Sequence, residues 1–336
     1  MRSPATFILG TVAFVTTTLL APSAAWATFP GSNGKIAFQR GGNIWVMNPD
    51  GTGQVRLTSS GTAANPQWSA GGWKIAYDQG SANSGRDIWV MNANGSNKYR
   101  VTTHVMNEYD PAWSPSGAWL AFATDRNVHG EIFKIRATAP FGRAVRLTRT
   151  AGTGEPVPSD EDPYLSDSQP NWSPSGTRIA FSRFERTDDA SSGAFIIELT
   201  TMNPDGSGVR QNHDKNGLAE TCPNWGPGGL RISWVDDEYE FEFGSSSNNV
   251  WHSILDGSDQ QNVTHFARFT PPFWDLGCAS WSPHRGAWIV FSGAKDADGD
   301  GNVDGVRALY KVASNGLSEP TLLARGNNPD WGPATP

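Results

Sequence analysis

One short unit built around a tryptophan recurs along this chain and restricts its fold more than any other feature. The unit reads ANPQWSAGGWKIAY at 64–77, YDPAWSPSGAWLAF at 109–122 and SQPNWSPSGTRIAF at 168–181. More divergent copies stand at 221–234 and 277–291, and NNPDWGP at 327–333 is a half copy. The marker tryptophans are Trp68, Trp113, Trp172, Trp225, Trp281 and Trp331, spaced 45 to 59 residues apart. A spacing of this length indicates a repeat architecture.

Each copy predicts four short strands. The tryptophan ends the first strand, and Ser-Pro-Ser-Gly then makes a turn, in which proline presets φ and glycine closes the reversal. An apolar strand such as IAY at 75–77 follows, then a strand such as DIWVMN at 87–92. A hairpin turn such as NPDG at 48–51 leads to a last strand carrying VRLT at 55–58. Six such units predict an all-β fold, a six-bladed β-propeller of four-stranded blades.

The two ends of the repeat region predict how the ring closes. The last copy has the Trp331 turn but no apolar strand after it, whereas GSNGKIAF at 31–38 has an apolar strand with no tryptophan strand before it. We therefore expect strand 34–38 to pair with the Trp331 strand, which would leave no open edge in the ring. An open solenoid or a sandwich is the alternative.

The first 27 residues have the pattern of an export signal. Arg2 is followed by an apolar or small stretch at 7–21, and Ala25-Trp26-Ala27 offers a cleavage site. The apolar stretch of about 15 residues is shorter than the roughly 20 that a membrane helix needs. We expect a signal peptide at 1–27 and one propeller domain at 28–336, exported to the periplasm or beyond as a monomer without a membrane span. A retained anchor is the alternative.

Charge narrows the choice of partner. The formal net charge is −7, and no basic patch with interleaved aromatic residues occurs, which argues against nucleic acid. The predicted loops at 149–168, 183–192, 236–248 and 293–305 are long and hold 17 of the 33 acidic residues. In this strand order they share one face, opposite the short turns. That face could dock a cationic partner, or it could simply be well solvated.

Polar residues precede the tryptophan strands at positions expected near the central channel. The equivalent residues are Asn65, Asp110, Gln169 and Asn328, with Glu108 nearby. This set could bind a small polar ligand or a peptide end at the channel mouth, or it could cap strand ends and hold water. Cys222 and Cys278 occupy the same position in adjacent blades. An exported chain with two cysteines favours a disulfide, although diverging strands could hold the two residues apart.

The segment KDADGDGNVDG at 295–305 matches part of a calcium-binding loop. Its candidate ligands are Asp296, Asp298, Asp300, Asn302 (through its carbonyl) and Asp304. Arg307 stands where such a loop usually has a bidentate glutamate, so the set would be completed by water or another carbonyl. We expect a structural calcium ion that braces a long loop. A polar hairpin without metal is the alternative.

Catalytic motifs are absent from the sequence. The six histidines form no H-E-x-x-H spacing, and there is no G-x-S-x-G nucleophile elbow. We therefore expect a binding or scaffolding module for a protein, peptide or glycan. The alternative is a lyase or hydrolase acting on a polysaccharide or peptide, which would place histidine and carboxylate side chains within about 3–5 Å of one another at the channel mouth.

The repeat also carries a family resemblance. P-x-W-S-P-x-G-x-x-I-A-F followed by IWVMNPDG and RLT resembles the TolB-like (WD40-like) propeller repeat, over essentially the whole of 28–336. The periplasmic TolB has an α/β domain ahead of its propeller, whereas here the repeat begins at once. The resemblance implies a propeller without that domain, and it implies a role in the Tol–Pal system only weakly.

Overall fold

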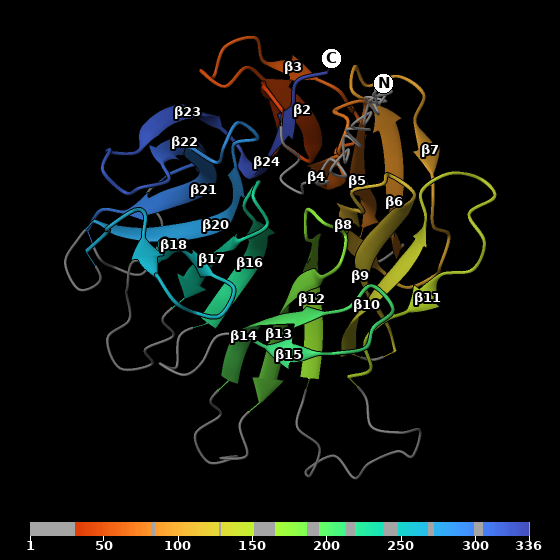
Figure 1. The fold of residues 1–336 in the computed structure, drawn as a ribbon. Helices are drawn as coiled ribbons and strands as arrows, with labels where there is room; N and C mark the ends of the chain where they lie inside the picture. The colour runs from red at the N-terminus through yellow and green to blue at the C-terminus, as the bar shows by residue number, and fades with distance from the viewer. Residues whose placement is uncertain are drawn as a thin grey trace, which may run out of the picture.

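The protein is a ring of six four-stranded antiparallel sheets. The computed structural model describes residues 31–81, 85–127, 129–150, 165–186, 195–212, 219–237, 248–267, 272–298 and 305–335. Within these residues all regular elements are strands, arranged in six separate sheets. Figure 1 shows the sheets around a common centre, with β24, β4, β8, β12, β16 and β20 innermost. The predicted six-bladed propeller is confirmed.

The strand bounds are as follows, blade by blade. Blade 1 comprises β24 (Asn327–Pro333), β1 (Asn33–Arg40), β2 (Asn43–Met47) and β3 (Val55–Arg56). Blade 2 comprises β4 (Ala63–Trp68), β5 (Lys74–Ser81), β6 (Gly85–Asn92) and β7 (Tyr99–Arg100). Blade 3 comprises β8 (Glu108–Trp113), β9 (Trp119–Asn127), β10 (His129–Arg136) and β11 (Val145–Arg146). Blade 4 comprises β12 (Leu165–Trp172), β13 (Ile179–Arg186), β14 (Phe195–Met202) and β15 (Arg210–Gln211). Blade 5 comprises β16 (Ala219–Trp225), β17 (Arg231–Asp237), β18 (Asn249–Ile254) and β19 (Gln261–Asn262). Blade 6 comprises β20 (Phe273–Trp281), β21 (Trp288–Asp296), β22 (Ala308–Ala313) and β23 (Thr321–Arg325).

The ring closes through the two ends of the repeat region. Strand β1 pairs antiparallel with β24, so that Ile36 lies opposite Trp331 and Ala37 opposite Asp330. Blade 1 therefore takes its innermost strand from the C-terminal part of the chain and the other three from the N-terminal part. The predicted pairing of 34–38 with the Trp331 strand is confirmed.

The core lies between blades, and this explains why the second strands are apolar at successive positions. Side chains alternate across a strand, and here both faces of the sheet are covered. Ile36 and Phe38 pack in a cluster shared with blade 6, which includes Val290 and Leu309. Ala37, the residue between them, packs in a cluster shared with blade 2. Neighbouring blades are thus held together by interleaved apolar side chains.

The marker tryptophans are buried where the innermost strands of neighbouring blades meet. All six are at most 5% exposed. The backbone N–H groups of Trp68, Trp113, Trp225 and Trp331 donate to a side chain of the preceding blade, for example Trp113 to Gln67 Oε1 at 2.8 Å and Trp225 to Asn171 Oδ1 at 3.2 Å. The residue just before each tryptophan therefore serves as an acceptor for the next blade in several places around the ring.

The outermost strand is very short in five of the six blades, and β23 of blade 6, with five residues, is the exception. Strands β3, β7, β11, β15 and β19 have two residues each. Edges this short offer few unpaired backbone groups for pairing with another chain.

The connections divide between two faces. The Ser-Pro-x-Gly turns and the hairpins such as 48–51 and 203–206 lie on one face, which we call the turn face. The long loops leave the sheets at the opposite ends of the strands, for example where Arg186 pairs with Phe195 and where Phe273 pairs with Asp296. We call this side the insertion face. Most of its predicted loops lie outside the described residues.

Candidate functional site: the central cavity

Six equivalent residues, one from each innermost strand, line a small cavity at the centre of the ring. They are Asn65, Asp110, Gln169, Cys222, Cys278 and Asn328. The cavity has a volume of about 90 Å³, and the prolines that follow these residues also form its wall. The ring lies part of the way along the strands: Asp110 is the third residue of β8 and Gln169 the fifth of β12. Four of the five residues predicted at the channel mouth therefore meet here.

The backbone turns these side chains inward. Strand pairing shifts register at this point of each innermost strand, for example between Tyr109 and Ala112. Five of the six ring residues have left-handed φ, between 46° and 55°, which costs energy in residues other than glycine. All five precede proline, which disfavours the right-handed helical region for the residue before it. The exception, Cys278, precedes Ala279.

Asn65 is the centre of a hydrogen-bonded cluster that joins three blades. Its Nδ2 donates to Asp110 Oδ1 at 2.7 Å and to Asp78 Oδ2 at 2.8 Å. Its Oδ1 accepts from Asn328 Nδ2 at 2.5 Å. Asp78, on β5, is fully buried and forms an ion pair with Arg86 at 2.6 Å. The amide of Asn65 is thus fixed in orientation by partners on both sides.

Both carboxyl groups in this cluster have a raised pKa. Burial, reinforced by the charge of Asp78, raises the pKa of Asp110 to about 7. Burial also raises the pKa of Asp78, and the opposing attraction of Arg86 offsets part of that effect. At neutral pH the pair therefore carries less than two full negative charges.

A third carboxyl group links three blades beside the cavity. Asp330 Oδ2 accepts from the backbone N–H of Trp68 at 2.6 Å, and its Oδ1 accepts from Ser280 Oγ at 3.2 Å. Burial raises its pKa to about 6, although the hydrogen bond from Trp68 acts in the other direction. The cavity wall thus contains two carboxyl groups, Asp110 and Asp330, that titrate near neutral pH.

The opposite side of the cavity is uncharged. Cys222 and Cys278 form a disulfide between blades 5 and 6, with their Cα atoms 5.1 Å apart. Gln169 completes this side: its Nε2 donates to Cys222 Sγ at 3.2 Å, and its Oε1 accepts from the Cys222 N–H at 2.8 Å and from Ser182 Oγ at 3.0 Å. One half of the ring therefore consists of two amides and a carboxyl group, Asn328, Asn65 and Asp110. The other half consists of Gln169 and the disulfide.

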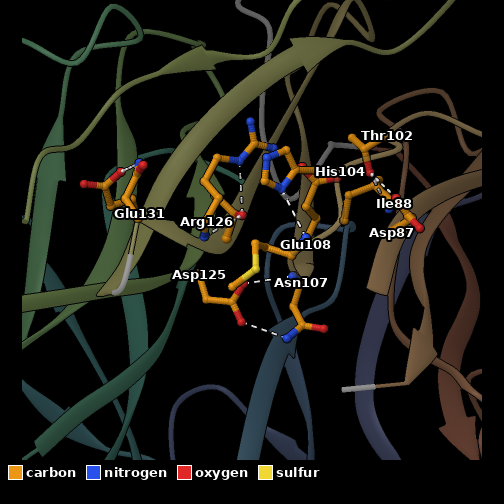
Figure 2. A network of polar contacts seen from close by, with 12 residues as sticks. Asp87, Ile88, Thr102, His104, Asn107, Glu108, Asp125, Arg126 and Glu131 are labelled. Atoms are coloured by element: carbon orange, nitrogen blue, oxygen red, sulfur yellow. Dashed lines mark hydrogen bonds and ion pairs between the residues drawn. The ribbon is translucent and has the colours of Figure 1, made fainter. Parts of the chain in front are cut away.

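Glu108 does not line the cavity. It is completely buried on β8 and pairs with Arg126, whose guanidinium group lies 4.4 Å from the centre of the Phe133 ring. Figure 2 shows this pair beside Asn107, which donates from its N–H and its Nδ2 to Asp125 at 2.8 and 2.7 Å. Glu108 was predicted at the channel mouth because it is close in sequence to Asp110. Its carboxylate instead pairs with Arg126 and does not line the cavity.

Asp78 and Asp330 were missed by the sequence analysis. A pattern exists for Asp78: it directly follows an apolar triplet of its strand, as Ser182 and Ser292 do. These residues contact the ring or its neighbours, Ser182 through Gln169 and Ser292 through Asn327 at 2.6 Å. Asp330 has the same position relative to its tryptophan as Gln67 and Asn171, whose side chains bind the next blade.

The predicted calcium loop is only partly described. Asp296 ends β21 and is buried, and Asp298 is exposed, whereas Asp300, Asn302 and Asp304 lie outside the described residues. Among the residues that the structure does describe, no group of three or more histidine, cysteine, aspartate or glutamate side chains is placed to hold a metal. Calcium therefore stays a prediction.

The predicted signal peptide at 1–27 also lies outside the described residues. In the part of the chain that is described, no helix is long and apolar enough to cross a membrane.

Comparisons with known proteins establish the fold. No protein-family model matches the sequence, and no curated protein matches it. Among solved structures, TolB from Acinetobacter baumannii aligns with 92% of this chain and 68% of its own, at 16% identity and a TM-score of 0.60. A putative TolB from Agrobacterium tumefaciens aligns over 84% of this chain and 89% of its own, at 16% identity and a TM-score of 0.58. Oligogalacturonate lyase from Vibrio parahaemolyticus aligns over 89% and 77%, at 13% identity and a TM-score of 0.52. The predicted TolB-like propeller is confirmed as a fold.

Proposed function

We propose that this chain is an exported, monomeric, non-catalytic binding propeller that receives a group from a protein, peptide or glycan partner in its central cavity. The observation that carries this proposal is the convergence of side chains from all six blades on one cavity. Strained backbone at five of these positions is the kind of local cost that accompanies functional sites. The disulfide and the Asn65 cluster would hold the ring rigid, so little ordering would be required on binding.

The size of the cavity limits what can enter. Small-molecule sites usually measure about 300–1,000 Å³. A volume of about 90 Å³ admits several water molecules or the end of one side chain. The partner would therefore insert a side-chain-sized group and make its remaining contacts outside the cavity. A positively charged group would suit the side of the cavity wall that contains Asp110 and Asp330.

The acidic residues of the insertion face would attract a partner electrostatically before it reaches the cavity. Its predicted loops carry 17 of the 33 acidic residues, and 14 remain when Asp167, Asp236 and Asp296, which are buried on β12, β17 and β21, are set aside. This density favours a cationic partner, and binding would then weaken as ionic strength rises. We propose that calcium at 296–304 braces one of these loops. Export rests on the sequence of residues 1–27, and a disulfide is in keeping with an oxidising compartment.

The wall chemistry favours binding over catalysis. An acid–base enzyme would place histidine and carboxylate side chains in reach of one another. The cavity wall, as far as the structure describes it, consists of amides, prolines, carboxyl groups and the disulfide, and it includes no histidine. The nearest pair of carboxyl groups, Asp78 and Asp110, is engaged by Arg86 and Asn65.

Affinity capture from the native envelope and medium tests the proposal. Wild-type chain is compared with Asp110→Leu, which alters the cavity, and with Leu317→Ser, which alters an 86% exposed side chain on the turn face. We expect a partner that is recovered with wild type and Leu317→Ser, is lost with Asp110→Leu and is released by salt. Equal recovery with all three proteins would contradict the proposal, as would product formation from polygalacturonate or peptides by the wild-type chain alone.

A further inference from the structure

A second and larger hollow lies on the turn face, at the seam where the two ends of the repeat region meet. Its volume is about 450 Å³, within the range of small-molecule sites. It is bounded by the start of β1, by residues 333–335 and by the hairpins at 48–49 and 93–94 of blades 1 and 2. In blades 2 to 6 a turn joins the first two strands covalently. Here the two segments meet through a hydrogen bond from the Ala334 N–H to the Ser32 carbonyl at 2.8 Å, and the hollow lies beside this join.

The wall of this hollow has a different charge character from the rest of the molecule. The side chains that give it hydrogen-bonding capacity are Asn33, Lys35, Asn48, Asn94 and Thr335. No carboxylate is among the described lining residues, although the chain as a whole has a net charge of −7. One ammonium group in a wall whose described residues include no carboxylate disfavours cations. Uncharged amides suit a ligand with many hydroxyl groups, and the lysine tolerates an added carboxylate.

Each of the three amides is held by the protein at one end and has no described partner at the other. Asn33 Oδ1 accepts from the His284 N–H at 2.9 Å, and Asn94 Oδ1 accepts from the N–H and Oγ of Ser96 at 3.0 and 2.7 Å. Asn48 Nδ2 donates to Thr52 Oγ1 at 3.0 Å. The amino groups of Asn33 and Asn94 and the Oδ1 of Asn48 remain for a ligand. Donors and acceptors fixed in this way need little ordering on binding.

Two tryptophans complete the surroundings. Trp68 forms part of the wall, and its buried indole N–H has no acceptor among the described residues, whereas the equivalent Trp113 donates to the Gln67 carbonyl at 3.2 Å. Trp73 is 58% exposed. Its backbone adjoins the hollow, because its neighbour Gly72 lines the hollow and its carbonyl accepts from the N–H of Ala93, another lining residue, at 2.8 Å. An exposed indole offers a flat apolar surface on which a sugar ring can stack.

We infer that this seam hollow is a carbohydrate-binding site for a saccharide of one or two residues, neutral or carrying one carboxylate. The amide groups would bind hydroxyl groups, Lys35 would bind a carboxylate where one is present, and Trp73 would cover an apolar face of the ring. This site is separate from the central cavity. The inference does not depend on the function proposed for that cavity.

The chain itself supplies conservative substitutions for a test. In blades 1, 4 and 5 an aspartate occupies the turn position of Asn94 and accepts the same pair of hydrogen bonds, as Asp205 does from Ser207 at 2.9 and 2.7 Å. Asn94→Asp therefore keeps the turn while replacing the free amino group with a negative charge. Asn33→Asp likewise keeps the acceptor for His284. Asp205→Asn is the matched control in a turn that does not line the hollow.

The probes are cellobiose, N,N′-diacetylchitobiose and glucuronic acid, added separately to the full chain. Binding is detected by saturation-transfer NMR and quantified by titration calorimetry. We expect saturable binding of at least one saccharide by the wild type. Asn33→Asp combined with Asn94→Asp should weaken it about tenfold or more, as the loss of two hydrogen bonds requires. Trp73→Ala should weaken it to a similar degree.

The controls make the test decisive. Asp205→Asn and Trp288→Ala, the latter at another exposed tryptophan of the turn face, should bind as the wild type does. Absence of saturation transfer from all three saccharides would overturn the inference. So would binding that the seam variants leave within twofold of wild type, or binding that the control variants weaken equally.

Discussion

The backbone N–H of Trp68 donates to Oδ2 of Asp330 at 2.6 Å, although 262 residues separate the two in the chain. The same carboxyl group accepts from Ser280 Oγ at 3.2 Å. Asp330 belongs to blade 1, Trp68 to blade 2 and Ser280 to blade 6. One side chain therefore ties the closing blade to both of its neighbours, next to the central cavity.

Replacement of Asp330 by alanine should destabilise the protein by about 1–3 kcal/mol, because it leaves the buried N–H of Trp68 without an acceptor. Asp330→Asn retains one oxygen and should cost less. Denaturant unfolding monitored by circular dichroism measures both variants against wild type. A loss for Asp330→Ala no larger than that for Asp330→Asn would show that the carboxyl group is not important for closure.

Stability should also depend on pH through the cavity. The native pKa is about 7 for Asp110 and about 6 for Asp330, against about 3.9 for an aspartate in an unfolded chain. The native protein therefore binds more protons than the unfolded chain between about pH 4 and 7, and these two groups make stability rise as pH falls from 8 toward 5.

Asp110→Asn removes one of the two groups, so its melting temperature should change less over this pH range than that of the wild type. Melting curves at pH 5, 6, 7 and 8 give the comparison. Glu319→Gln makes the same change of charge at an exposed position and should leave the wild-type slope unaltered. Parallel slopes for all three proteins would contradict the raised pKa of Asp110.

The disulfide between Cys222 and Cys278 should contribute about 2–4 kcal/mol, since it restricts the unfolded chain across a separation of 56 residues. Reduction should lower the melting temperature of the wild type. The double variant Cys222→Ser with Cys278→Ser should melt near the temperature of the reduced protein and should not respond to reductant. Two thiols titratable in the unreduced, denatured wild type would rule out the bridge.

Calcium should stabilise the protein through the loop at 296–304. A chelator should lower the melting temperature of the wild type, and Asp298→Ala combined with Asp300→Ala should abolish that response, because it removes two of the four carboxylates. Asp256→Asn, in a turn of blade 5, is the control and should respond as the wild type does. An unchanged melting curve at saturating chelator would refute the calcium site.

Sequence reasoning located the ring of the central cavity but not the groups that determine its chemistry. Asn65, Asp110, Gln169 and Asn328 could be aligned because each precedes the same proline and tryptophan. The position of Asp78 could also be aligned, with Ser182 and Ser292, but its role could not be predicted, since that role depends on Asn65 across one strand pair and on Asp110 in the next blade. Glu108 was assigned to the ring on sequence proximity, and only the position of Arg126 shows that its carboxylate is bound elsewhere.

The sequence by itself determined the number of blades, the strands in each blade and the pairing that closes the ring. These features follow from local signals, namely turn residues at fixed offsets and apolar strands. Such signals can be recognised within the sequence of each repeat. Only the tertiary structure decided which side chains share the centre and that Asp78 lies close enough to Asp110 to raise its pKa. The contacts of Asn65 with Asp110 and Asn328 span 45 and 263 residues, and they exist because the curvature of the whole ring brings six separate repeats to one axis.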